Sequence, residues 1–384
     1  MPWAATITLL PALTAGAIPM LLKEAAGKWS RDSSYPNLQD ELWDIIDKLA
    51  DSTDIAAIQD AYIKADAAGS GQSKALRLLV KLGTTNALAF VQKNVPFTKE
   101  KEPAVGNFFG VFYQHPEAIA PLLPGWYKLV TDTTYGPAVV MMHQHAQDSN
   151  YAVQSPASFQ EDVMTLGRNM LQLISRNKDE YYPYMNEVIK ALGKLATPEA
   201  DALLFDYATK LPDTGYIGYQ ALQQLIDHEV YPTEPIAKYS ADPYWRSSLY
   251  SLLEENEQVK VMPAKYRTQL MMAEAYLYDN VDDYDIDTLI AVGERELLFM
   301  GKKYRFYLFK AGLYVEENKL SYYHAVAGPF ALDRNNVSLQ EENVYATYLS
   351  GDPFDKKNVD KWLKEYLKSL EEEQTEVDAP KEEE

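Results

Sequence analysis

The chain contains no cysteine among its 384 residues. This absence excludes a disulfide framework, a thiolate metal site and a cysteine nucleophile. It does not identify a compartment, because a chain without thiols suits an oxidising environment as well as a reducing one.

The sequence also lacks an apolar run long enough to cross a membrane, so we expect no membrane span. Its most apolar segment is the opening MPWAATITLLPALTAGAIPMLL, which Pro2, Pro11 and Pro19 interrupt. This segment has no basic region of the kind that begins a signal peptide. We predict that residues 1–36 form short apolar helices packed on the first helical repeat. Such a start would also suit a chain cut from a longer protein.

Positive charge is in the minority, with 36 Lys and Arg against 56 Asp and Glu and a net charge of −20. Phosphate backbones and anionic lipid headgroups would be repelled by this charge, because no counterions would be released on contact. The sequence therefore predicts no nucleic-acid partner.

Helical periodicity dominates residues 37–280. In NLQDELWDIIDKLAD the apolar residues recur at helical spacing on one stripe. Two segments, LVKLGTTNALAFV (residues 79–91) and LGKLATPEADALL (residues 192–204), share a pattern in which Thr84 or Thr197 can cap the second helix. A helix pair that cannot bury its apolar face alone is the unit of a solenoid. We predict a mainly α fold, a HEAT-like α-solenoid of antiparallel helix pairs.

The period changes after residue 280. LIAVGERELLFM, YRFYLFKAGLYV and LSYYHAVAGPF are rich in β-branched and aromatic residues and are separated by turn signals. Residues 281–370 are therefore predicted to form a three-stranded antiparallel β-meander and a closing helix. The closing helix, KNVDKWLKEYLKSL, has an apolar stripe on one face, formed by Val359, Trp362, Leu363, Tyr366, Leu367 and Leu370. The last residues, 371–384, form an acidic run that we predict to be a disordered tail.

Several motifs in series resemble one family. The block PYWRSSLYSLLEENEQVKVMPAKYRTQLMMAEAYLYD, followed by GKKYRFYLFK and YYHAVAGPFALD, is similar to the C-terminal region of long bacterial TraB/GumN-family proteins. The resemblance extends over roughly Asp51 to Asp333. It rests on several motifs in series, and none of these motifs is diagnostic by itself.

This resemblance implies a helical accessory module with HEAT-like repeats. The metalloprotease-type chemistry of the family lies in a separate catalytic domain, and its His and Glu motifs have no match here, so no catalytic residue is carried over. The resemblance also implies a periplasmic or cell-envelope location.

The segment AVVMMHQHAQDS concentrates soft metal ligands. A helix turns about 100° per residue, so His143 and His145 lie on different sides, whereas Met141, Met142 and His145 share a side and form a candidate copper site. We favour an ordinary core helix, with Tyr135, Val139, Met142 and Ala146 as its core stripe, His145 at the edge and His143 nearer solvent.

A second candidate metal site is DYDIDTLIAVGE. Its acids, at EF-hand positions one, three, five and twelve, are candidate calcium ligands: Asp283, Asp285, Asp287 and Glu294. Thr288 stands where the loop needs glycine, and the following residues are typical of a strand. An acidic surface loop ahead of a strand is the favoured interpretation, and no cofactor is predicted.

The 28 tyrosines occur in clusters, such as Tyr181, Tyr182 and Tyr184, then Tyr216 and Tyr219. Half-buried packing between helices explains most of them, and a peptide-binding or glycan-binding groove is the alternative. Since no complete catalytic motif is present, we predict a non-enzymatic interaction or scaffold module with a protein or peptide partner. The alternative is an all-helical carbohydrate-active hydrolase or lyase with a carboxylate pair in a Tyr-lined cleft.

Overall fold

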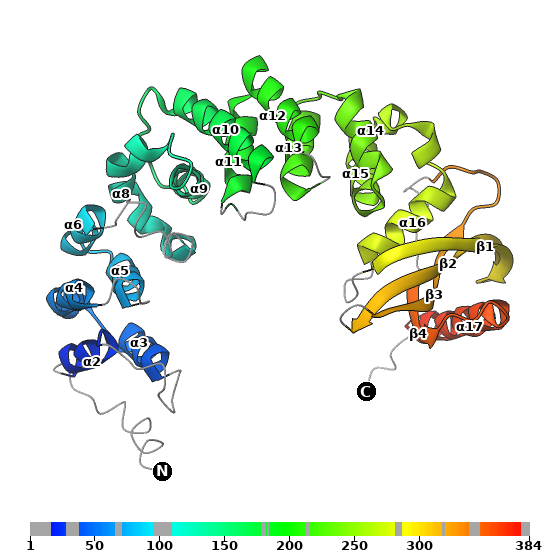
Figure 1. Cartoon of the computed structure of the whole chain (residues 1–384), viewed down its shortest axis with the longest axis horizontal. Coiled ribbons are helices and arrows are strands. Elements are labelled where there is room, and N and C mark those ends of the chain that lie inside the picture. The colour runs from blue at the N-terminus through cyan, green and yellow to red at the C-terminus, as the bar shows by residue number, and fades with distance from the viewer. Residues whose placement is uncertain are drawn as a thin grey trace, which may run out of the picture. The chain divides into compact units, whose positions relative to one another are not determined.

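A computed structural model describes residues 17–27, 38–65, 71–94, 110–177, 182, 184–211, 215–280, 286–316, 319–337 and 346–377. The fold is mainly helical, with a small antiparallel sheet and a C-terminal helix (Figure 1). This confirms the predicted mainly α class with a small antiparallel sheet and a closing helix. Within these ranges, no helix combines the length and apolar character that a membrane crossing needs.

The chain divides into two compact units, Met1–Leu203 and Leu204–Glu384. In the first unit consecutive helices pack on one another, as α4 does on α5 and α8 on α9. Its helices are α2 (Ile18–Ala25), α3 (Leu38–Leu49), α4 (Ile55–Lys64), α5 (Gly71–Leu82), α6 (Thr85–Asn94), α8 (Ile119–Trp126), α9 (Gly136–Asp148), α10 (Phe159–Arg176), α11 (Met185–Leu195) and the start of α12 (Pro198–Lys210). Of the predicted apolar helices over residues 1–36, α2 is described and packs on α3 and α4, whereas residues 1–16 lie outside the described ranges.

The two repeated helix starts have the predicted caps. Thr84 Oγ1 accepts a hydrogen bond from the Ala87 amide at 3.3 Å, and Thr197 Oγ1 accepts one from the Ala200 amide at 3.2 Å. Each hydroxyl satisfies an amide that has no partner inside its own helix. The shared sequence pattern therefore encodes the same local structure twice.

We expect Thr197→Ala to lower the free energy of unfolding by about 1 kcal/mol, because the Ala200 amide loses its acceptor. Urea unfolding monitored by circular dichroism measures this loss. Thr209→Ala is the matched control, since the Thr209 hydroxyl only bonds back to the Phe205 carbonyl within α12 and should matter by less than about 0.5 kcal/mol. Equal losses in the two variants would refute the cap.

Four helices begin the second unit: α13 (Tyr216–Asp227), α14 (Thr233–Ala241), α15 (Pro243–Glu255) and α16 (Gln269–Asn280). They pack in order, α13 on α14, α14 on α15 and α15 on α16. The last of them, α16, also packs on the sheet that follows. For this reason the compact units do not follow the predicted boundary at 280/281.

The sheet has the strand order β1-β2-β3-β4, and every neighbouring pair is antiparallel. Its strands are β1 (Ile286–Phe299), β2 (Lys302–Glu316), β3 (Lys319–Phe330) and β4 (Ala346–Pro353). The first three are the predicted meander. The prediction of three strands was one short, because β4 returns to pair with β3.

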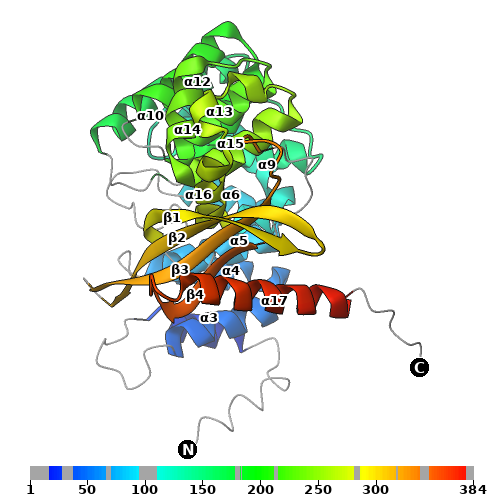
Figure 2. The same cartoon turned by 90° about the vertical axis from the view of Figure 1, so that its right-hand side faces the viewer.

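Helices cover both faces of this sheet, as Figure 2 shows. On one face α17 (Val359–Val377) packs through Val359, Leu363 and Leu367 against Phe306 and Leu308. Side chains alternate along a strand, so Tyr307 lies on the opposite face, where its hydroxyl is 3.3 Å from Oε1 of a glutamine on α16. The predicted apolar stripe of the closing helix is confirmed.

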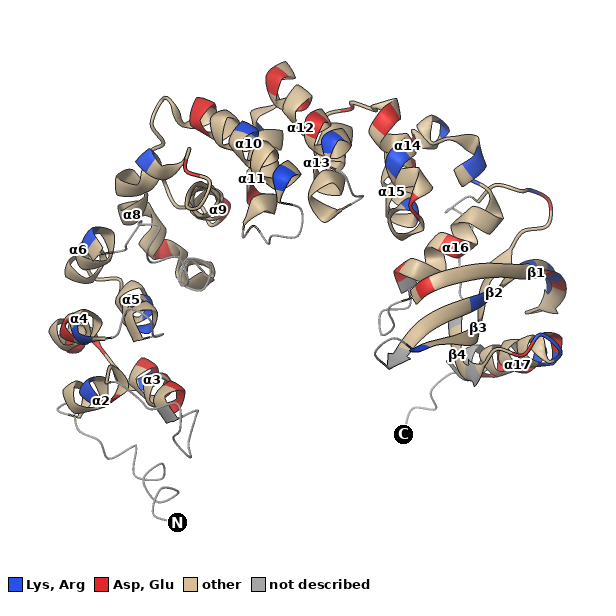
Figure 3. Ribbon diagram, in the orientation of Figure 1, with Lys and Arg blue, Asp and Glu red and all other residues tan. Residues whose placement is uncertain are grey.

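Helix α17 ends later than predicted. It continues through residues 371–377, which had been assigned to the disordered tail, and residues 378–384 lie outside the described ranges. Both signs of charge follow one another along the helix (Figure 3). Lys368 pairs with Glu372 at i,i+4 spacing, and Glu371 Oε1 accepts from the Met300 amide at 2.6 Å. The acidic run is helical here because these contacts support the extra turns.

Candidate functional site

The Met/His segment forms α9, which is buried on nearly all sides. Residues 136–144 are all buried, because α8, α10 and α11 contact this helix. The predicted core stripe is confirmed, but the prediction that His143 lies nearer solvent was wrong. His143 is only 5% exposed, and its Nδ1 lies 2.9 Å from Tyr127 Oη.

Burial of these two groups changes their protonation. It lowers the pKa of His143 to about 4, with a smaller contribution from the positive charge of Lys194. It raises the pKa of Tyr127 to about 12. At neutral pH the imidazole is therefore neutral and the tyrosine hydroxyl can donate to it. His143 is a packed core residue with a hydrogen bond, and its ring contacts that of Phe159 with centroids 4.2 Å apart and planes tilted by 43°.

The copper candidates lie on this same helix. Met141 and Met142 are buried, and His145 is half-buried with its ring 5.1 Å from that of Tyr113. His145 Nε2 is buried and makes no hydrogen bond. No group of three or more His, Asp or Glu side chains in the described ranges could hold a metal ion. The copper site formed by Met141, Met142 and His145 stays a candidate.

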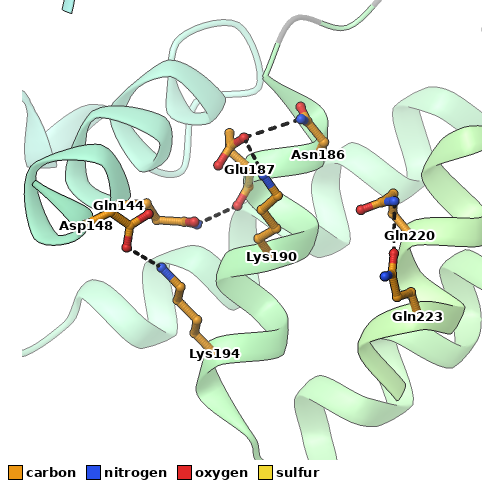
Figure 4. Close-up of polar contacts among 8 residues, drawn as sticks. All are labelled: Gln144, Asp148, Asn186, Glu187, Lys190, Lys194, Gln220 and Gln223. Atoms are coloured by element: carbon orange, nitrogen blue, oxygen red, sulfur yellow. Dashed lines mark hydrogen bonds and ion pairs between the residues drawn. The ribbon is translucent and has the colours of Figure 1, made fainter. Parts of the chain in front are cut away.

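A row of polar contacts links α9 to α11, from the buried Gln144 to the exposed Asp148 (Figure 4). Gln144 Nε2 donates to the Glu187 carbonyl at 2.6 Å, and Lys194 pairs with Asp148 at 3.3 Å. Glu187 also pairs with Lys190 at 3.0 Å. In the second unit, Figure 4 shows a separate pair within α13, in which Gln220 Nε2 donates to Gln223 Oε1 at 3.1 Å. Exposed ion pairs of this kind contribute little, so the row joins two helices and does not mark a reaction site.

Two of the four calcium candidates lie in the described part of the chain. Asp283 and Asp285 lie outside the described residues. Asp287 and Glu294 both lie on β1, where seven residues of extended chain separate them by about 23 Å. Glu294 instead lies 3.8 Å from Arg305 Nε on β2. Positions five and twelve of an EF-hand bind one ion, and Asp287 and Glu294 are too far apart to share one.

A cluster of aromatic rings lies at the start of α13 and of α15 in the second unit. Trp245 stacks on Tyr219, with centroids 4.5 Å apart and planes 21° apart, and Tyr239 meets the Trp245 ring edge-on. Tyr244 and Tyr216 flank the same indole at 5.0 and 6.4 Å. Tyr216 is 53% and Tyr244 58% exposed, Trp245 is half-buried, and the two other tyrosines are buried. We call Tyr216, Tyr244 and Trp245 the aromatic surface.

Local sequence fixes this arrangement. Asp242 Oδ1 accepts from the Tyr244 amide at 2.9 Å and caps α15, and Pro243 begins the helix. Gly218 lets α13 approach Tyr239, since a Cβ there would lie 2.2 Å from the tyrosine oxygen. The rings therefore project from a rigid base, which lowers the entropy lost when a partner binds.

Comparison of the chain with family models, curated proteins and solved structures gave no match.

Two acidic side chains, Asp242 and Asp279, interact with residues of this aromatic cluster and of α15. Asp279 on α16 is exposed and accepts from Ser247 Oγ at 3.0 Å. Burial raises the pKa of Tyr219, and the negative charge of Asp279 adds to that shift. For Tyr239, burial is again the larger cause of a raised pKa and Asp242 the smaller. Both carboxylates thus act electrostatically on the rings of this cluster.

The cations of α14 and α15, Lys238 and Arg246, already have partners, and Lys238 Nζ also lies 5.5 Å from the centre of the buried Tyr239 ring. Arg246 is 2% exposed and pairs with Glu274 at 2.9 Å. Lys238 Nζ donates to the carbonyl at the end of α12, that of Leu211, at 2.7 Å. Between Tyr216 and Asn280 the sequence holds nine Asp and Glu against five Lys and Arg. The aromatic surface therefore lies in a negative environment.

Sequence reasoning found only part of this cluster. It grouped Tyr216 with Tyr219, but it did not connect them with Tyr244 and Trp245. The available signal was Asp-Pro-Tyr-Trp, which puts two aromatic residues in the first turn after a cap. Of the other tyrosine cluster, Tyr181 lies outside the described residues.

Proposed function

We propose that this chain is a non-enzymatic protein-interaction or scaffold module, and that the aromatic surface is where a protein partner binds. The observation that supports this proposal is the exposure of Tyr216 and Tyr244 beside the half-buried Trp245 on a rigid base. Tyrosine and tryptophan are the side chains most enriched where binding energy concentrates, because they offer large contact area with few rotatable bonds.

The proposal includes a HEAT-like arrangement of the helix pairs. Its support is the repeated capped helix start at Thr84 and Thr197 and the packing of consecutive helices within each unit. The relation to TraB/GumN-family proteins, and with it a cell-envelope location, rests on the motif series alone and stays a prediction.

Affinity capture with matched baits tests the interaction. The parent chain, the double variant Tyr216→Ala/Tyr244→Ala and the control Tyr314→Ala are immobilised, and proteins from a native cell-envelope extract are quantified on each. Tyr314 is 58% exposed, so the control removes an equally exposed ring from β2. We expect at least one protein to be depleted about tenfold on the double variant alone. An identical set of captured proteins on all three baits would refute the proposal.

A further inference from the structure

We propose that the occupant of the aromatic surface is a basic segment of a protein partner, one whose Arg or Lys side chains lie over the exposed rings. This inference rests on the proposed function and names the chemistry of its partner.

The aromatic rings are the first feature of this surface that suits a basic segment. A guanidinium or ammonium group is attracted to the face of tryptophan most strongly and to the face of tyrosine next. Trp245 is held on its inner side by Tyr219, which fixes the indole plane, while Tyr216 and Tyr244 leave more than half of their area open. The chain itself uses this contact nearby, where Lys265 Nζ lies 4.5 Å from the centre of the Tyr266 ring.

The carboxylates near the rings are the second feature that suits a basic segment. Asp242 adjoins Tyr244, whose amide donates to it at 2.9 Å, and Asp279 accepts at 3.0 Å from Ser247 on the helix that carries Trp245. The cations of the same helices are already paired with Glu274 or with backbone carbonyls. An approaching Arg or Lys therefore meets negative charge together with open ring faces. An acidic partner would meet repulsion from the same carboxylates, and from the net charge of −20 on the chain.

Charge distinguishes this occupant from a neutral glycan. A sugar also stacks on exposed tryptophan and tyrosine, but it carries no charge, so its affinity would depend on the rings and little on salt. A basic segment would depend on rings and carboxylates together, and its affinity would fall as salt screens the attraction.

Calorimetric titration of the full chain separates these cases. The probes are a ten-residue Arg/Gly peptide, a Glu/Gly peptide of equal length and a neutral hexasaccharide. The variants are Tyr216→Ala/Tyr244→Ala, Asp242→Asn and Asp279→Asn, with Glu255→Gln as the control. Asn keeps the helix cap that Asp242 provides. Glu255 lies on the same helix, about 15 Å along its axis from Trp245, so the control removes equal charge away from the rings.

We expect the Arg/Gly peptide alone to bind. Its affinity should fall about tenfold in the double tyrosine variant, about threefold in each Asp→Asn variant and not measurably in Glu255→Gln. Circular dichroism confirms that the variants remain folded, as the exposure of both tyrosines predicts.

Three outcomes would overturn the inference: no binding of the Arg/Gly peptide, equal losses in Glu255→Gln and the Asp variants, or ring-dependent binding of the hexasaccharide. In each case, ring-dependent capture of a protein from the extract would leave the proposed function standing. Failure of both experiments would remove both proposals.

Discussion

Arg246→Met is expected to lower the free energy of unfolding by about 3–5 kcal/mol, the cost of removing one partner from a buried charged network. Arg246 is 2% exposed. Its guanidinium donates to the Ser240 and Met271 carbonyls, each at 2.7 Å, and to the Ala241 carbonyl at 3.1 Å, besides its pair with Glu274. Methionine fills part of the volume but leaves three carbonyls and a carboxylate without their donor.

The matched control for this substitution is Arg295→Met. Arg295 pairs with Asp360 at 2.8 Å, but both side chains are exposed, so its loss should matter by less than about 1 kcal/mol. Urea unfolding of both variants measures the difference. A second variant, Arg246→Lys, should also be destabilised, because an ammonium cannot reproduce the planar fork of donors. Equal stabilities of Arg246→Met and Arg295→Met would contradict this role of the arginine.

We expect His143 to contribute about 3 kcal/mol to the change of the unfolding free energy with pH. Its pKa in the folded chain is lowered to about 4 from an ordinary value of 6.5. The folded state therefore binds this proton less readily than the unfolded state does. The stability linked to His143 is fully present above about pH 6.5 and is lost as the pH falls toward 4.

Unfolding free energies of the parent and His143→Gln, measured between pH 7.5 and 4, test this term. Glutamine stays neutral and can still accept from the Tyr127 hydroxyl. The parent should lose about 3 kcal/mol more than the variant over this interval, whereas the carboxylates that titrate in both cancel in the difference. Parallel pH profiles would show that His143 does not resist protonation.

Features set by local sequence could be predicted. The caps at Thr84 and Thr197, the three long strands and the apolar stripe of α17 each follow from residues close together in the chain. Strand β4 could not, because its eight residues include Ser-Gly-Asp-Pro, a turn-like composition, and only pairing with β3 makes them a strand. The extension of α17 beyond residue 370 likewise depends on a contact with Met300, 71 positions away.

The candidate site was harder to predict for a related reason. A helical wheel places His143 at the margin of the stripe, about 40° from Val139, and the packing of other helices around α9 decides that it is buried. Tyr216 and Trp245 are 29 residues apart in the chain. Their rings meet because α13 and α15 pack together with their first turns close to each other. Periodicity identifies which face of a helix is apolar, but it does not say which helix starts lie together.

Photo-crosslinking from the aromatic surface tests the central claim most directly. Tyr244→p-benzoylphenylalanine and Tyr314→p-benzoylphenylalanine are irradiated in the same native extract, and the adducts are identified by mass spectrometry. If a basic segment of a protein binds the aromatic surface, we expect a protein adduct from position 244 and none from position 314. The crosslinked peptide should be rich in Arg or Lys. Identical adducts from both positions, or adducts from position 314 alone, would contradict it.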